Sequence, residues 1–394
     1  MQDVKNVAVI GSGTMGSGIA QIAATAGCKV VLIDTNDVAL HKARSGHQKI
    51  MNRLVEKGRM TQEKADDVLS KIEYRLGLEE TCDCQLIIEA IIENIEIKKK
   101  LFTSLEKVIS SNAIIATNTS SLSVASIAAS CELSNRVVGL HFFNPAPLLP
   151  LVEVIPSLLT DKEVAESVFE LMKTWGKIPV YAKDTPGFIV NRVARPFYGE
   201  ALRIYDEGLV PEGEVGFATI DAALKKQGGF RMGPFELMDL IGNDINYTVT
   251  ETVFREFYFD PRYKPSFTQK RMKEAGLLGR KTKKGYYNYI EGAVKAEPVI
   301  DEQLSKDIYW RVLVMLINEA VEALYLNVAD RDGIDKAMTK GVNYPKGLLA
   351  WADEVGLDDV LGALDSLHHV YGEDRYRASR LMRQMVKEEK KFYS

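Results

Sequence analysis

The sequence predicts an α/β domain built on a parallel sheet, followed by two tandem all-α helical domains. Over the first 184 residues, short β-branched runs alternate with helical patterns, which is typical of a parallel sheet with crossover helices. From Thr185 onward a 3.6-residue periodicity dominates and clear strand patterns nearly disappear. An internal repeat divides this helical part in two. We therefore expect domains at residues 1–184, 185–290 and 304–394.

The expected strands of the first domain are short apolar runs rich in Val and Ile. They cover Val7–Ile10, Lys29–Ile33, Leu86–Glu89, Ala113–Ala116, Val137–Leu140, Leu151–Ile155 and Ile178–Tyr181. After the third of them, apolar residues recur at helical spacing among Lys and Glu, which predicts an amphipathic helix that packs on the sheet: Ile97, Leu101, Leu105 and Val108. Pro186 and Gly187 end the last strand, and a helix is expected from about Phe188.

The helical part repeats itself at an offset of 114 residues. Ile220-Asp-Ala-Ala-Leu224 matches Ile334-Asp-Lys-Ala-Met338. The same offset aligns Phe230 with Tyr344, Gly233 with Gly347, Asp239 with Asp353, Gly242 with Gly356 and Asp244 with Asp358, and an offset of 119 aligns Glu200-Ala201 with Glu319-Ala320. The polar linker Glu291–Gln303 separates the copies. We expect them to pack on each other as a pseudo-symmetric pair.

Composition and charge exclude several classes of protein. The 394 residues are 46% hydrophobic and 26% charged, with a formal net charge of −4, which argues against a protein that coats nucleic acid or an anionic membrane. No apolar run approaches the ~20 residues of a membrane helix. A strand-like run begins at Val7, so no targeting peptide is expected. Four cysteines cannot make a disulfide framework, and Cys82 and Cys84 lack metal-site spacing. We expect a cytoplasmic protein with reduced thiols and no metal.

A glycine motif, Gly11-Ser-Gly-Thr-Met-Gly16, follows the first expected strand and opens a helical pattern. In that setting Gly11 permits a tight turn, Gly13 lets a pyrophosphate approach the backbone, and Gly16 permits close helix–strand packing. Asp34 ends the second strand, where a carboxylate accepts hydrogen bonds from an adenosine ribose and repels a 2′-phosphate. These observations predict a Rossmann-type dinucleotide-binding domain that prefers NAD to NADP.

His141 and Glu153 form the candidate catalytic pair. His141 ends a buried-looking strand, and Glu153 lies within the next one, Leu151-Val-Glu-Val-Ile155. A carboxylate in an apolar strand needs a partner, which an imidazolium would supply. Placed over a nicotinamide, the pair makes a general base for alcohol oxidation. The other four histidines are expected at the surface or in packing: His41, His47, His368 and His369.

Five segments together resemble the (S)-3-hydroxyacyl-CoA dehydrogenases of β-oxidation and butyrate-type metabolism. They are Gly11–Gly16, Asn118-Thr-Ser-Ser-Leu122, His141-Phe-Phe-Asn-Pro145, Leu151-Val-Glu-Val154 and Asp184-Thr-Pro-Gly-Phe-Ile-Val-Asn-Arg192. The helical part adds Met232–Leu237 and Gly279–Tyr286, and the C-terminal extension looks like the duplicated helical domain of longer bacterial members. The resemblance covers nearly the whole chain. It implies reversible NAD-dependent oxidation of an (S)-3-hydroxyacyl-CoA to a 3-oxoacyl-CoA.

The resemblance also implies roles for individual residues. His141 would take the proton from the 3-hydroxyl, and Glu153 would orient His141. Ser120 would hydrogen-bond the substrate hydroxyl or the nicotinamide side, and Asn191 would position the reacting carbonyl. Trp310 stands in the second copy where Asn191 stands in the first, so we expect one active site per chain. Read from the residues alone, Ser120 is also a candidate helix N-cap, and Asn191 a residue that caps or cross-links helices.

Further positions match cofactor and CoA contacts of the family. Those for the cofactor are the glycine motif with Thr14 and Met15, then Asp34, Glu93, Lys98, Ser120, Asn144 and Lys281. From the residues alone, a solvated pair on a helix face is the less favoured alternative for Glu93 and Lys98. Lys57 matches a CoA contact, although Ile50 stands where a Ser is expected. Leu149-Pro150 replaces the Met-Lys that many members have, which leaves the shape of the acyl pocket open.

Several functions and assembly states remain open at this point. The leading one is a short-chain 3-hydroxyacyl-CoA dehydrogenase, acting for example on 3-hydroxybutyryl-CoA in fatty-acid or related metabolism. A 3-hydroxyadipyl-CoA dehydrogenase of phenylacetate breakdown is an alternative, because the tandem architecture resembles such members. A dehydrogenase for a free hydroxy acid or sugar acid, and a non-catalytic NAD-binding protein like certain lens crystallins, are the others. The chain is expected as a homodimer or as a monomer with an internal pseudo-dimer.

Overall fold

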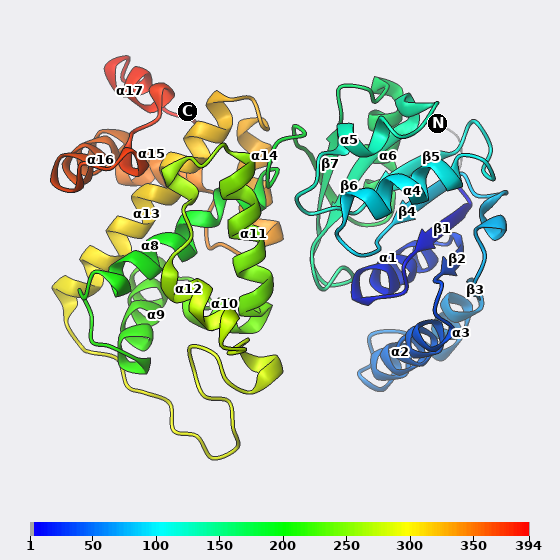
Figure 1. Ribbon diagram of the computed structural model, residues 1–394, viewed down its shortest axis with the longest axis horizontal. Coiled ribbons are helices and arrows are strands. Elements are labelled where there is room, and N and C mark those ends of the chain that lie inside the picture. Colours follow the sequence, from blue (N-terminus) through cyan, green and yellow to red (C-terminus); the bar gives the residue numbers. More distant parts are fainter. Residues whose placement is uncertain (1–3, 394) are drawn as a thin grey trace. The chain divides into compact units, whose positions relative to one another are not determined.

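The computed structural model describes residues 4–393, and the chain divides into two compact units, Met1–Phe188 and Ile189–Ser394. The first unit carries the sheet and the second is helical (Figure 1). Among residues 4–393, no helix has the length and apolar composition needed to cross a bilayer. The sheet unit and the helical unit are therefore described in turn.

The first unit is built on one eight-stranded sheet in the order β3-β2-β1-β4-β5-β6-β7-β8. Its strands are β1 (Asn6–Ile10), β2 (Lys29–Ile33), β3 (Ile72–Arg75), β4 (Leu86–Glu89), β5 (Ile114–Thr117), β6 (Val137–Phe142), β7 (Leu151–Pro156) and β8 (Ile178–Tyr181). The connecting helices are α1 (Thr14–Thr25), α2 (Asp37–Glu56), α3 (Gln62–Ser70), α4 (Ile95–Leu105), α5 (Val124–Ala128) and α6 (Lys162–Thr174). The strand order reverses between β1 and β4, as in a doubly wound dinucleotide-binding fold.

The seven predicted strands and the amphipathic helix α4 all form, and two features differ from the prediction. β3 was not predicted, because Ile72-Glu-Tyr-Arg75 has a single buried apolar residue and pairs with β2 at the sheet edge. β6 and β7 run antiparallel in a sheet that was expected to be parallel. The connection at residues 143–150 contains no helix, and a parallel crossover needs a dozen or more residues.

Both faces of the sheet are covered, which is why its central strands are apolar along their whole length. In β1, Val7 and Val9 belong to the core that contains Ile19 of α1, and Ala8 belongs to a separate core that contains Phe102 of α4. All of these residues are fully buried. A strand with two buried faces cannot alternate apolar and polar residues, so a continuous Val/Ile run results.

The second unit begins with α7 (Val190–Val193) and consists of two similar sets of helices. The first set comprises α8 (Arg195–Asp206), α9 (Glu214–Gly228), α10 (Pro234–Ile241), α11 (Asn243–Glu256), η3 (Pro261–Tyr263), α12 (Phe267–Glu274) and η4 (Arg280–Thr282). The second comprises α13 (Glu302–Tyr325), α14 (Arg331–Gly341), α15 (Leu348–Val355), α16 (Leu357–Tyr371), η5 (Asp374–Tyr376) and α17 (Arg380–Lys387). The long helix α13 packs against α8 and α9 of the first set.

The repeated aspartates have the same structural task in both sets. Asp221 accepts two backbone hydrogen bonds from the first turn of α10, and Asp335 accepts two from the first turn of α15, at 2.9–3.0 Å. Tyr287 closes the first copy by donating to Asp221 at 2.7 Å, and Tyr393 closes the second by donating to Asp335 at 3.0 Å. The sequence repeat therefore preserves helix capping, because buried helix N-termini need acceptors for their amides.

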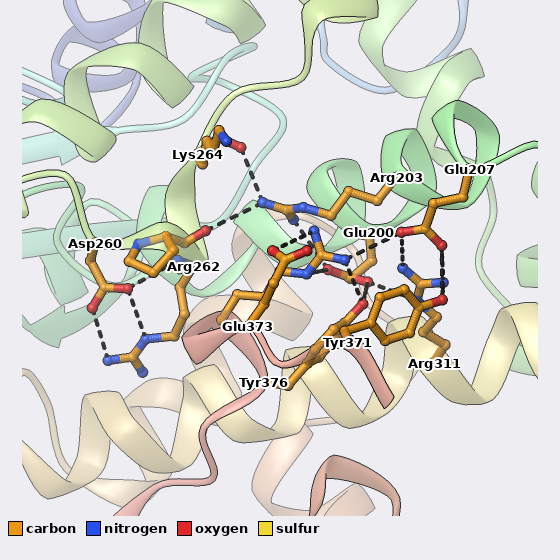
Figure 2. A network of polar contacts seen from close by, with 12 residues as sticks. Glu200, Arg203, Glu207, Asp260, Arg262, Lys264, Arg311, Tyr371, Glu373 and Tyr376 are labelled. Carbon is orange, nitrogen blue, oxygen red and sulfur yellow. Dashed lines mark hydrogen bonds and ion pairs between the residues drawn. The ribbon is translucent and has the colours of Figure 1, made fainter. Parts of the chain in front are cut away.

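Where the two copies meet, Glu200 of α8 lies in a buried network of cations and hydroxyls (Figure 2). Arg311 of α13 donates its Nε to Glu200 at 2.9 Å, and the Tyr376 hydroxyl donates to the same carboxylate at 3.1 Å. Arg311 also binds Glu207 through two nitrogens at 2.7 and 2.9 Å, and Arg375 lies 3.3 Å from Glu207. Thus a glutamate of the first copy is held by side chains of the second.

Glu319 of α13 is the counterpart of Glu200 in the second copy, and its partners belong to the first copy. Arg192 of α7 donates Nε to Glu319 at 2.6 Å, the Tyr263 hydroxyl donates at 2.5 Å, and Arg262 lies 3.7 Å away. Each copy therefore supplies arginines and a tyrosine to the buried glutamate of the other. This reciprocity is the pattern of an isologous two-fold interface, formed here within one chain.

Candidate active site

The glycine turn between β1 and α1 has the shape that a dinucleotide requires. Gly11 has φ of +100°, and a Cβ there would lie 2.6 Å from the carbonyl oxygen of Ala90. A Cβ on Gly16 would lie 1.7 Å from the carbonyl oxygen of Gly11, whereas at Gly13 nothing lies within 4 Å. Gly13 is the N-cap of α1 and brings no capping side chain, so the first amides of α1 receive no side-chain cap from it. A pyrophosphate fits there.

Asp34 lies at the carboxyl end of β2 and is held in place by the same turn. The amide and hydroxyl of Ser12 both donate to its Oδ2 at 2.8 Å, and the amide of Asn36 donates to Oδ1 at 3.0 Å. Burial opposes ionisation, but these hydrogen bonds outweigh it and lower the pKa of Asp34. The carboxylate is therefore charged at neutral pH, which suits a ribose diol and disfavours a 2′-phosphate.

His141 and Glu153 face each other directly across the antiparallel pair β6–β7. His141 Nδ1 lies 2.6 Å from Glu153 Oε2, and both residues are buried, with Glu153 fully so. Because the carboxylate accepts the Nδ1 hydrogen, Nε2 is the imidazole nitrogen left to exchange a proton. The rings of Phe143 and Phe188 lie 4.3 and 5.8 Å from the imidazole centroid and form apolar walls beside it.

Lys98 is buried beside Glu93, whose own side chain is 35% exposed, so the two do not form a solvated pair on a helix face. The Lys98 side chain is 1% exposed, and its Nζ lies 3.3 Å from Glu93 Oε2. Glu93 Oε1 accepts hydrogen bonds from the Thr119 hydroxyl at 2.6 Å and from the amide and hydroxyl of Ser120 at 2.9 and 3.3 Å. The N-cap reading of Ser120 is wrong, because Ser123 caps α5. Glu93, Lys98 and Ser120 thus meet beside the end of β5.

The remaining predicted residues lie on four other segments. Asn144 is exposed on the loop after β6, and Lys57 is exposed at the end of α2. Asn191 lies in α7 and Lys281 in η4, both in the helical unit, where Lys281 Nζ binds Asp244 at 2.5 and 2.6 Å. The roles of these four residues stay predictions.

Sequence reasoning missed several residues that build this site. Glu89, at the end of β4, accepts a hydrogen bond from Lys98 Nζ at 2.5 Å. Asn118 accepts a hydrogen bond from the amide of Phe142 at 2.8 Å and so ties the end of β5 to the strand of His141. The signal for Glu89 was present, because an acidic residue that ends an apolar strand needs a buried partner just as Glu153 does.

The site lies at the carboxyl edge of the parallel strands, where doubly wound sheets bind their ligands. A turn shaped for a dinucleotide and a buried imidazole–carboxylate pair on the same edge define a dinucleotide-dependent dehydrogenase.

Comparison with known families identifies which one. Residues 6–185 match the NAD-binding domain of 3-hydroxyacyl-CoA dehydrogenase, and residues 187–289 and again 308–392 match its C-terminal domain. The chain belongs to the 3-hydroxyacyl-CoA dehydrogenase family and is an NAD-dependent oxidoreductase.

Individual relatives agree with this assignment. The 3-hydroxyadipyl-CoA dehydrogenase of Escherichia coli is 38% identical over 98% of both chains. The 3-hydroxybutyryl-CoA dehydrogenase of Clostridioides difficile is 41% identical and covers 72% of this chain and 99% of its own. Among solved structures, a 3-hydroxybutyryl-CoA dehydrogenase of Escherichia coli superposes with a TM-score of 0.91 at 37% identity, covering 98% of this chain and 99% of its own.

Proposed function

We propose that His141 is the acid–base group of a reversible oxidation of (S)-3-hydroxyacyl-CoA to 3-oxoacyl-CoA. Bound NAD supplies the hydride acceptor. In the oxidative direction, neutral His141 takes the hydroxyl proton at Nε2, and in the reductive direction the imidazolium returns it. A positioned acid–base group of this kind contributes about 10²–10⁴ in rate. The observation that carries the proposal is the buried contact of 2.6 Å between His141 Nδ1 and Glu153 Oε2.

Glu153 has two tasks in this scheme. Its carboxylate fixes the tautomer with hydrogen on Nδ1, which leaves the lone pair of Nε2 free to accept a proton. It also stabilises the positive charge that His141 acquires, and because the pair is buried, water does not compete for that interaction.

Positions that match the family complete the proposed site. We assign the substrate hydroxyl or the nicotinamide side to Ser120, the reacting carbonyl to Asn191, and a CoA contact to Lys57. The nicotinamide half of the cofactor is assigned to Glu93, Lys98, Asn144 and Lys281, and the pyrophosphate and adenosine half to the turn Gly11–Gly16 and Asp34. The contacts of Glu93 with Ser120, at 2.9 and 3.3 Å, support treating these two residues as one element.

The basic test uses acetoacetyl-CoA and NADH, with oxidation of NADH followed by absorbance. We expect turnover by the full chain, and its loss in His141→Ala with NADH affinity retained. Turnover of free acetoacetate without CoA would instead favour a hydroxy-acid dehydrogenase. Binding of NADH without turnover of any acyl-CoA would favour a non-catalytic protein, a reading that the intact pair of His141 and Glu153 disfavours.

For the acyl group we propose a short chain such as 3-hydroxybutyryl. The second candidate is 3-hydroxyadipyl-CoA, favoured by the similarity of this chain to the Escherichia coli 3-hydroxyadipyl-CoA dehydrogenase over 98% of both lengths. Comparing kcat/KM for 3-hydroxybutyryl-CoA and 3-hydroxyadipyl-CoA separates them. A tenfold preference for the dicarboxylic substrate would replace the first proposal with the second.

For the assembly we propose domains at 1–184, 185–290 and 304–394, with a catalytic role for the first helical copy only. The reciprocal contacts of Glu200 and Glu319 support an internal pseudo-dimer and therefore a monomeric chain. Sedimentation equilibrium tests this, and a mass of two chains would establish the homodimer instead.

We also propose a cytoplasmic location, since Cys28, Cys82, Cys84 and Cys131 are all thiols.

A further inference from the structure

Lys98 is buried and lies close to two carboxylates, those of the buried Glu89 and the partly exposed Glu93, and the three side chains form a cluster. Its Nζ is 2.5 Å from Glu89 Oε1 and 3.3 Å from Glu93 Oε2. The side chains of Lys98 and Glu89 are 1% and 0% exposed. Glu89 Oε1 also accepts a hydrogen bond from the amide of Ile91 at 2.8 Å, and Oε2 accepts one from the Thr117 hydroxyl at 2.6 Å.

The cluster carries more negative charge than its own stability requires. One ammonium neutralises one carboxylate, so a Glu–Lys–Glu set has a net charge of −1. Burial opposes ionisation of Glu93, but Lys98 and the hydrogen bonds from Thr119 and Ser120 outweigh it and lower the pKa of Glu93. Glu89 alone pairs the buried Lys98 at 2.5 Å, and the second carboxylate, on Glu93, is 35% exposed and adds a charge that this ion pair does not need.

The position of the cluster in the sheet connects it with the cofactor. Glu89, the last residue of β4, is in register with Ile10, the last residue of β1, directly before the glycine turn. A doubly wound sheet binds its dinucleotide across this reversal of strand order. Asp34, directly after β2, marks the adenosine side, so the nicotinamide half of a bound cofactor would extend over the β4–β5 side. That side carries Glu93 and Ser120.

We propose that Glu89 is a positioning residue that holds Lys98 and thereby keeps a net negative charge beside the nicotinamide, so that the oxidised, positively charged ring is bound more tightly relative to the neutral reduced ring. The proposal rests on the proposed function for its use of NAD. One consequence is that the equilibrium between bound reactants shifts toward the alcohol and the oxidised cofactor. The overall equilibrium in solution is unchanged.

The test compares affinities for the two redox forms of the cofactor in the full chain carrying Glu89→Gln. NADH is titrated by fluorescence and NAD⁺ by calorimetry, without substrate. We expect the ratio of Kd for NAD⁺ to Kd for NADH to rise about tenfold, as removal of a unit charge within ~10 Å at an effective dielectric constant of ~20 implies. Glu89→Asp should restore the ratio to within about threefold of the wild type, since it keeps the charge.

Two further variants separate charge from local distortion. Thr117→Val removes the hydrogen bond to Glu89 and leaves the cluster charge, so the ratio should stay near that of the wild type. Glu63→Gln removes an exposed carboxylate from the first turn of α3 and controls for overall charge. If Glu89→Gln does not fold, Glu93→Gln removes the same unit of charge at a partly exposed position and should raise the ratio in the same way.

The outcomes distinguish this inference from the proposed function. Equal weakening of NAD⁺ and NADH in Glu89→Gln, or a ratio equal to that of the wild type, would overturn the role of Glu89 and leave the dehydrogenase assignment intact. Absence of NADH binding by the wild-type chain would instead overturn the proposed function and with it this inference. A raised ratio in Glu89→Gln together with a preserved ratio in Glu89→Asp supports the role of the charge.

Discussion

Replacing Glu153 by Gln tests the part played by the buried carboxylate in the proposed chemistry. The substitution keeps side-chain size and removes the charge that faces His141 Nδ1 at 2.6 Å. Hydrogen bonds to charged groups contribute about 1.5–3 kcal/mol. Glu153 is fully buried, so we expect no water to replace the lost interaction. Since about 1.36 kcal/mol corresponds to tenfold in rate, kcat should fall about 10- to 150-fold through the loss of imidazolium stabilisation.

The assay is steady-state reduction of acetoacetyl-CoA with NADH, together with the Kd of NADH and a thermal unfolding curve. NADH affinity should change by less than about threefold, because Asp34 and the glycine turn are untouched. Glu163→Gln, an exposed carboxylate in the first turn of α6, serves as the matched control and should leave kcat unchanged. A folded Glu153→Gln protein with kcat within threefold of the wild type would refute the proposed role of the pair.

Three further perturbations test other parts of the structure. Glu319→Gln should destabilise the helical unit by about 3–5 kcal/mol in urea unfolding, because it removes the carboxylate that pairs the buried Arg192. A loss no larger than that of the exposed control Glu256→Gln would contradict this. Gly13→Ala should fold normally yet bind NADH at least about tenfold more weakly. Gly11→Ala should instead lower the thermal stability of the sheet unit. The same melting temperature and the same NADH affinity in the two variants would contradict the geometry of the turn. Glu207 titrates with a lowered pKa: burial opposes its ionisation, but hydrogen bonds and charge from two arginines outweigh that effect. Its contribution to stability is therefore present above the ordinary pKa of 4.5 and is lost as the pH falls through the lower pKa of the folded state. Glu207→Gln should flatten the loss of stability measured in urea between pH 5 and pH 3. An unchanged slope of stability against pH would contradict this prediction.

The parts of the fold that depend on local pattern could be predicted from the sequence. The strands that are buried on both faces are recognised in the sequence as continuous runs of apolar residues, such as Leu86-Ile-Ile88 in β4. β3 lacks such a run, because it is an edge strand with one buried apolar residue. The antiparallel pairing of β6 and β7 goes with the short, helix-free connection between them, which is too short for a parallel crossover.

The same contrast holds for the site. His141 and Glu153 could be paired from the sequence because two neighbouring strands carry them. The contact of Lys98 with Glu89 could not be predicted from the sequence, because it depends on how α4 packs against the end of β4. The contacts of Glu200 with Arg311 join residues more than 100 positions apart, and no local pattern links them.

Because each helical copy supplies the charged partners of the other copy's buried glutamate, the two copies depend on each other for the pairing of these charges. Because the linker Glu291–Gln303 tethers them, each copy meets its counterpart at an effective concentration on the order of millimolar. The two copies therefore stay paired even when the enzyme is diluted to nanomolar concentration, at which two separate subunits with the same contacts would dissociate. At the position that corresponds to Asn191 the second copy has Trp310, and the next residue, Arg311, binds Glu200 of the first copy.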